Sequence, residues 1–185
     1  MKLIHSLIQL VRIARMSATM NAEGATGTHK HLSLLADAAL GSTHLLLKAG
    51  TDASHVAVCG AANYPLGSTN DQPEAAEDLL NVFPLGAADH TRKLRCASAL
   101  GADIDLFTAA SGLVQGLPGV AGTYYKVGRS IGAAVQVGSS DYIIEVATCE
   151  PKKLTVIATA TGTAATDIAA LFTALQGTPD IVRAL

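Results

Sequence analysis

Charged and aromatic residues are scarce in this sequence. Asp, Glu, Lys and Arg make up 15% of its 185 residues, aromatic residues make up 4%, and there is no Trp, whereas globular proteins carry about 25% charged residues. The formal net charge of −2 creates no long-range field that would attract nucleic acid or an anionic membrane, so we expect neither as a partner. A lightly charged surface is better tolerated where a protein partner covers it, which favours assembly.

The sequence has only three cysteines, Cys59, Cys96 and Cys149, which are far apart and form no Cys-x-x-Cys pair. This pattern suggests neither a disulfide framework nor a zinc site. Free cysteine behaves as a small hydrophobic residue. We therefore expect all three to be buried in strands of a protein that folds in a reducing compartment.

Catalytic motifs are also missing. The sequence has no Gly-x-Gly-x-x-Gly, no Gly-Lys-Ser/Thr phosphate loop and no His-Glu-x-x-His. His29 and His31, with two further histidines near the first strands, are the best metal candidates, but a pair of exposed histidines in a linker explains them better. Asp103 and Asp105 could serve acid–base or Ca²⁺ chemistry, although a solvated strand edge is the commoner explanation. We expect no enzymatic activity, no metal and no cofactor.

Residues 1–30 are expected to form a helical arm and a linker. Apolar residues recur there at the spacing of an amphipathic helix, in two rows formed by Leu3, Leu7 and Leu10 and by Ile4, Ile8 and Val11. The apolar run is interrupted by polar residues and is too short for a membrane span, so it predicts neither a secretion signal nor an anchor. The helix packs on its own domain, precedes a functional start at Met16 or Met20, or grips a neighbouring subunit.

Residues 31–160 are expected to form a β-rich domain. Turn signals separate short apolar runs at spacings of roughly 8–12 residues, which is typical of a β-barrel or β-sandwich. Gly112 follows Ser111 at a predicted hairpin turn, where glycine supplies a positive φ at low cost. The predicted strands cover residues 43–48, 54–59, 79–85, 90–97, 103–110, 113–115, 124–128, 133–137, 142–147 and 154–158.

The predicted strand at 90–97 carries a small basic group. Lys93 and Arg95 alternate with Leu94 and Cys96, which predicts a half-buried strand with a basic outer face. Together with Arg92 they form a basic patch without interleaved aromatic residues, which is unlike a single-strand nucleic-acid binder. We expect this patch to contact an acidic protein surface.

Residues 161–185 are expected to form a helical extension. Its apolar residues recur at i, i+3 and i+4 spacing and are Ile168, Leu171, Phe172 and Leu175. Thr166 is available as N-cap and Gly177 as the stop. After Pro179, residues 181–185 either dock through their apolar side chains or stay loose.

The order of five segments resembles the head-decoration, or capsid cement, proteins of tailed phages. The segments are Tyr-Pro-Leu-Gly at 64–67, Val-Phe-Pro-Leu-Gly at 82–86, and the longer segments 101–112, 122–130 and 142–146. The resemblance covers about residues 45–147 and leaves both helical extensions outside it. It implies a compact β-barrel or sandwich that binds the outside of an assembled capsid, bridges major capsid protein subunits and carries no catalytic residues.

On this resemblance we expect the major capsid protein as partner, self-association as a trimer, synthesis in the host cytoplasm and a final place on the virion surface. The expected capsid or subunit contacts are Leu3, Leu7, Leu10, Val11, Arg92, Lys93, Arg95, Ile168, Leu171, Phe172 and Leu175. Two alternatives stay open. One is a tail- or fibre-associated β-domain of a virion, and the other is a small ligand-binding barrel or enzyme that uses His29, His31, Asp103 and Asp105.

Overall fold

The structure of this chain is a computed structural model that describes residues 31–86, 91–157, 164–176 and 181–184. The protein is mainly β, as predicted, and the described part holds a single α-helix. The predicted helical arm, with Leu3, Leu7, Leu10 and Val11, lies outside the described residues. No helix in the described ranges has the length and apolar character of a transmembrane segment.

The first half of the described chain closes into a five-stranded barrel. Its strand order is β1-β3-β2-β4-β5, and β1 closes the ring by pairing with β5 in antiparallel orientation. A cluster of buried aliphatic side chains, including Leu34, Val56 and Val82, fills its interior. The strands are β1 (Leu32–Ala36), β2 (Leu45–Ala49), β3 (His55–Val58), β4 (Gly67–Thr69) and β5 (Leu79–Pro84).

The second half forms another sheet that also closes on itself. Its order is β10-β11-β6-β8-β7-β9, and the additional pairing of β11 with β9 joins five of these strands into a ring. Leu94, Leu106 and Ile144 are among the side chains buried inside it. The strands are β6 (Thr91–Cys96), β7 (Asp105–Thr108), β8 (Val114–Gln115), β9 (Gly122–Ser130), β10 (Val135–Gln136) and β11 (Tyr142–Ile157).

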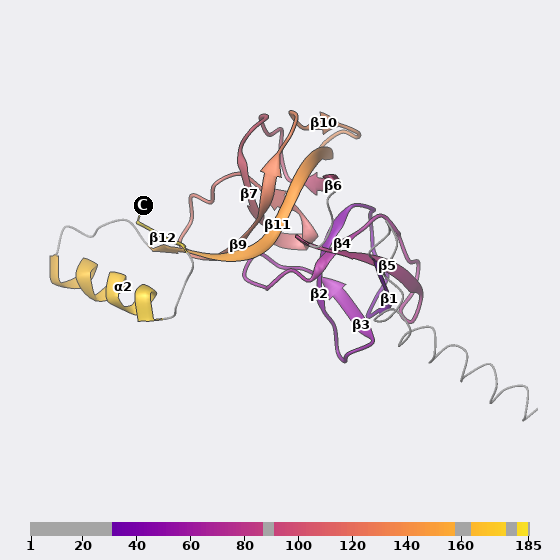
Figure 1. Ribbon diagram of the computed structural model, residues 1–185, viewed down its shortest axis with the longest axis horizontal. Helices are drawn as coiled ribbons and strands as arrows, with labels where there is room; N and C mark the ends of the chain where they lie inside the picture. Colours follow the sequence, from indigo (N-terminus) through magenta and orange to yellow (C-terminus); the bar gives the residue numbers. More distant parts are fainter. Residues whose placement is uncertain (1–30, 87–90, 158–163, 177–180, 185) are drawn as a thin grey trace, which may run out of the picture.

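The two sheets lie side by side (Figure 1) and share β2 as a common wall. Leu45 and Leu47 point into the first barrel, whereas Leu46 belongs to the buried cluster of the second. Main-chain bonds cross the same boundary, since the Arg95 amide donates to the His44 carbonyl at 2.9 Å. Neighbouring residues on a strand point to opposite faces, so the single strand β2 supplies both cores.

The hairpin predicted around Ser111 and Gly112 is confirmed. β7 and β8 pair in antiparallel orientation on either side of a 3₁₀ turn at Ala110–Gly112. Both turn residues adopt positive φ, 58° at Ser111 and 72° at Gly112. A Cβ at Gly112 would lie 2.9 Å from the Leu46 carbonyl oxygen, so glycine serves both the turn and the close packing on β2.

The prediction of two separate strands at 142–147 and 154–158 is wrong, because both segments belong to one continuous strand. The chain runs without a turn through β11, past Pro151, and its pairing register with β9 shifts between Thr148 and Lys152. Proline cannot donate to a ladder and is tolerated at such a bulge. The first part of β11 pairs with β6, and the later part continues beyond β6 and pairs with β9.

Gly128 lies where β9 crosses β11 most closely. A Cβ there would lie 2.6 Å from Cγ1 of Val146 and would collide with the main-chain oxygen of Ala147. We expect Gly128→Ala to lower the free energy of unfolding by about 1–3 kcal/mol, because the backbone must shift to make room. Urea denaturation followed by circular dichroism measures this. Gly132→Ala is the control, since a Cβ there meets nothing within 4 Å, and equal losses in both variants would contradict the packing argument.

The C-terminal part projects from the body. β9 and β11 leave the second sheet as a ribbon, β12 (Ile181–Ala184) pairs with β11 in parallel, and α2 (Ala164–Gln176) lies beyond it (Figure 1). The predicted helix is confirmed and ends directly before Gly177. Thr166 is not its N-cap, because the helix already begins at Ala164. Residues 181–184 form β12 and pair with β11, so this part of the segment docks rather than staying loose.

Candidate interaction surfaces

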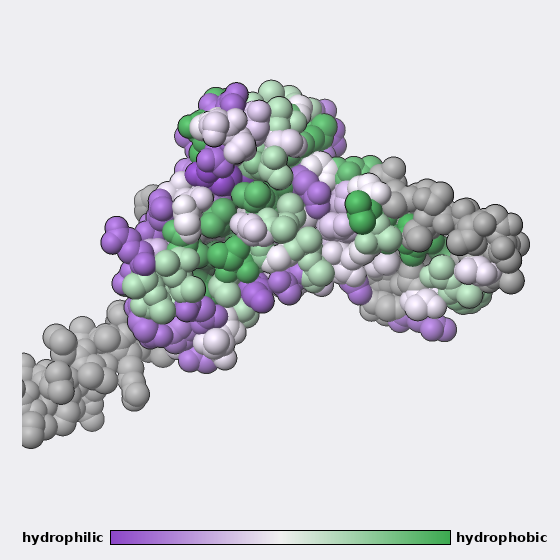
Figure 2. Space-filling model, turned by 180° about the vertical axis from the view of Figure 1, so that it is seen from behind, coloured by the Kyte–Doolittle hydropathy of each residue, from purple (hydrophilic) through white to green (hydrophobic). Residues whose placement is uncertain are grey.

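The helix α2 presents apolar side chains to solvent. Ile168, Leu171 and Phe172 are 53%, 41% and 61% exposed, and every α2 residue whose side chain is described is exposed. The helix carries one charged residue, Asp167. Figure 2 shows hydrophobic residues reaching the surface on the body and on this projecting part. An amphipathic helix is stabilised mainly by burying its apolar face, so α2 has the composition of a helix that packs against a partner. The side chain of Leu175 lies outside the described residues.

The basic residues predicted as one patch are not gathered on one face. The alternation is confirmed, with Leu94 and Cys96 buried. Arg92, however, lies on their side of β6, with its guanidinium 4.0 Å from the centre of the Phe83 ring. Burial lowers the pKa of Arg92 below its usual value. Its position over an aromatic face is a cation–π contact, so this residue joins β6 to the first barrel.

Lys93 and Arg95 are left on the outer face of β6. Arg95 is 14% exposed and forms an ion pair with Asp141 at 3.0 Å. Lys93 is exposed and lies opposite Glu145 in the β6–β11 register. Acidic neighbours therefore accompany both cations, and Lys93 is the more accessible of the two to a partner.

Asp103 and Asp105 are each engaged by a basic side chain. Asp103 precedes β7 in a left-handed conformation, with φ of 59°, and it accepts a 2.6 Å hydrogen bond from Nε of Arg129. This bond lowers the pKa of Asp103. Asp105 pairs with Lys126 at 2.8 Å. Each carboxylate is thus matched with a cation of β9, which ties β7 to β9.

The described histidines lie in three separate settings, and His29 is outside the described residues. The ring of His31 contacts Phe83 at 5.9 Å between centroids. Nδ1 of His44 lies 3.0 Å from the side-chain oxygen of Asn70. Across the described ranges, no group of three His, Cys, Asp or Glu residues is arranged to hold a metal ion. The residues of the ligand-site alternative are therefore not brought together where they are described.

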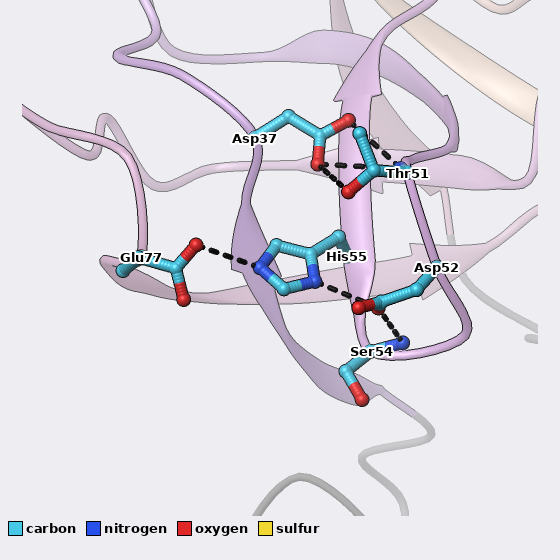
Figure 3. Close-up of polar contacts among 6 residues, drawn as sticks. All are labelled: Asp37, Thr51, Asp52, Ser54, His55 and Glu77. Carbon is cyan, nitrogen blue, oxygen red and sulfur yellow. Dashed lines mark hydrogen bonds and ion pairs between the residues drawn. The ribbon is translucent and has the colours of Figure 1, made fainter.

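His55 has a setting that the sequence reasoning missed (Figure 3). Its Nδ1 lies 2.7 Å from Oδ1 of Asp52 and its Nε2 lies 3.0 Å from Oε1 of Glu77. These contacts raise the pKa of His55, with the bond to Asp52 the larger cause, and they lower the pKa of Asp52. The i, i+3 spacing of Asp52 and His55 in a predicted turn was the available signal. The contribution of Glu77 comes from a distant segment and has no local signature.

The cysteines behave largely as predicted. Cys59 and Cys96 are buried and Cys149 is half-buried, and all three are free. Burial raises the pKa of Cys59 to about 11 and also raises the pKa of the other two. A thiol with a raised pKa is a poor nucleophile at neutral pH. These side chains therefore serve packing.

Two comparisons with known proteins give no match for this chain. No protein-family model matches its sequence. No curated protein matches it either.

Proposed function

We propose that this chain is a non-catalytic structural protein of a virion, which binds the outer surface of an assembled phage capsid and bridges major capsid protein subunits. The five segments of the sequence resemblance support the proposal by their positions. The first ends at the start of β4, and the others lie at the end of β5, at β7 with its turn, at β9 and at the first part of β11. They therefore span both closed sheets. In this proposal the sheets are the rigid body of a cement protein.

The observation that carries the proposal is the projecting C-terminal arm. Its helix α2 presents Ile168, Leu171 and Phe172 to solvent at a distance from the two sheets (Figure 1). An arm of this kind can contact one capsid subunit while the body contacts another. Two linked contacts raise the overall affinity through effective concentration, without requiring either contact to be strong. Repetition over the shell then multiplies a modest free energy per copy.

The body contact is proposed to involve the outer face of β6. Lys93 is exposed there, and an acidic capsid surface would complement it. Rim charges of this type act mainly on association rate and orientation. Self-association, as a trimer at a capsid three-fold position, is part of the same proposal and places several arms around one site.

Co-sedimentation of the purified full-length protein with emptied, expanded capsids of its source virus tests the proposal. We expect saturable binding, with a copy number per capsid that is tied to the symmetry of the shell. Capsids of an unrelated phage are the control. Absence of binding to the cognate capsid, with binding to purified tails at a few copies per virion instead, would replace the cement role with that of a tail or fibre component.

A further inference from the structure

The imidazole of His55 lies between two carboxylates that come from different segments (Figure 3). Asp52 belongs to the turn between β2 and β3, and Glu77 belongs to the segment that precedes β5. The His55 side chain is 12% exposed, whereas those of Asp52 and Glu77 are 60% and 71% exposed. The ring is thus covered while both partners stay in contact with water. Among the side chains drawn in Figure 3, His55 contacts both segments.

The geometry favours the charged form of the ring. A neutral imidazole carries one N–H donor, and its other nitrogen has a lone pair that would face a carboxylate oxygen. Here both nitrogens face carboxylate oxygens, at 2.7 and 3.0 Å. Only the imidazolium can donate to both at once. Charge-assisted bonds of this kind are about twice as strong as neutral ones.

The other acidic groups around His55 are already engaged. Asp37, which follows β1, accepts hydrogen bonds from the main-chain and side-chain groups of Thr51. Asp78, next to Glu77, accepts from the amides of Glu74 and Ala75. These carboxylates fix the turn and the loop separately. The imidazole of His55 bonds to a carboxylate of the turn and to one of the loop, and main-chain bonds from Ala36 to Asp78 and from Leu40 to Pro73 hold the loop as well.

The clasped segment is also held by the main chain of the barrel. The Glu77 amide donates to the Ala36 carbonyl at 2.9 Å, and Glu77 itself adopts a left-handed conformation with φ of 66°. A non-glycine residue in that conformation persists where its surroundings hold it in place. The bond to His55 is one of the contacts that hold it.

We propose that His55 is a proton-operated clasp, which fastens the side chain of Glu77 to the β2–β3 turn and releases it when the imidazolium loses its proton. The rest of the first barrel stays paired on release, because its strand ladders do not involve the ring. The proposal concerns the barrel alone and stands independently of capsid binding.

The pH window follows from the two pKa shifts. The pKa of His55 is raised from 6.5, so its contribution is fully present below pH 6.5 and is lost as the pH rises through the folded-state value. The pKa of Asp52 is lowered from 3.8, so its contribution is present above pH 3.8 and is lost as the pH falls through the folded-state value. The clasp is therefore closed between these limits and opens toward alkaline pH.

Amide hydrogen exchange on the full-length protein, corrected for intrinsic exchange rates, tests the clasp. We expect the Glu77 amide to lose protection as the pH rises from mildly acidic to mildly alkaline values. The Ala109 amide, which donates to the Leu113 carbonyl in the other sheet, is the internal reference and should keep its protection. Added salt should weaken the clasp, since both carboxylates are exposed to solvent.

The isosteric double variant Asp52→Asn, Glu77→Gln removes both charges and keeps the side-chain shapes. We expect the ¹H–¹⁵N titration of the His55 ring to move to lower pH in this variant, and the pH-dependent loss of Glu77 protection to disappear. His44→Gln is the matched control, because His44 contacts the neutral side chain of Asn70. The proposal is overturned if the Glu77 amide of the unsubstituted protein keeps the same protection across this range, or if the double variant retains the full pH dependence.

Discussion

Leu46→Ala is expected to lower the free energy of unfolding by about 3–5 kcal/mol, the upper part of the range for leucine deletion in a core. Leu46 is 0% exposed and belongs to β2 of the first barrel, yet it packs among Leu94, Leu106 and Val114 of the second. β2 is hydrogen-bonded to β3 on one side and to β4 on the other, so the backbone has little freedom to move into the space left by the missing atoms. The substitution thus leaves a cavity at the boundary of the two sheets.

Urea denaturation, followed by far-ultraviolet circular dichroism and by tyrosine fluorescence, measures the effect. We expect the two probes to report one coincident transition, because β2 contributes to both cores and couples their unfolding. Leu79→Ala is the control; Leu79 is 56% exposed, and surface changes usually cost no more than about 0.5 kcal/mol. Two separate transitions in the unsubstituted protein would show that the shared strand does not couple the sheets.

Replacing Ile168, Leu171 and Phe172 together with glutamine is expected to weaken capsid binding by roughly a hundredfold or more. These side chains are 41–61% exposed, and removal of a single hot-spot side chain costs at least about 2 kcal/mol, where 1.4 kcal/mol is tenfold in affinity. Glutamine has a helix propensity close to that of leucine, so α2 itself should persist. The melting temperature and circular dichroism spectrum should stay close to those of the unsubstituted protein.

Titration of capsids by co-sedimentation measures the affinity of this triple variant. Val135→Gln with Val137→Gln is the matched control, since these residues are 65% and 53% exposed at the β10 end of the body. An intact affinity in the triple variant would remove α2 from the contact. A comparable loss in the control would move the contact to the body.

Local sequence patterns were enough to predict most of the strands. β3, β5, β6 and the β7–β8 hairpin carry β-branched or alternating residues next to turn signals, and β2 is an apolar run that follows Thr43 and ends at a turn signal. Each lies where it was expected. β1 was missed because its sequence, Leu-Ser-Leu-Leu-Ala, lacks β-branched residues and consists mostly of helix formers. β4 has three small residues, Gly67 to Thr69, which are too few to show the alternation of apolar and polar residues that marks a strand.

The closure of the sheets could not be predicted from local patterns. It depends on pairings between distant segments, such as β1 with β5 and β9 with β11. The parallel pairing of β1 with β3 skips over β2. Such contacts are set by tertiary packing, which periodicity does not encode.

The candidate surfaces were predictable to a similar degree. The i, i+3 and i+4 spacing in α2 predicted a helix with Ile168, Leu171 and Phe172 on it, and their exposure fits an intermolecular contact. Arg92 was misplaced because charge alone suggested an outward side chain, whereas alternation with Leu94 turns it toward Phe83. The link from His55 to Glu77 joins residues far apart in the chain and becomes visible only once the barrel has closed.

The order of the two sheets along the chain matters during synthesis. The strands of the first barrel end at Pro84 and those of the second begin at Thr91, so the ribosome synthesises every strand of the first barrel before any strand of the second. Until then Leu46, Cys59 and Leu85, which the second sheet later buries, remain open to water. The incomplete chain therefore exposes an apolar surface for a limited time, and the later strands protect it from aggregation by covering it.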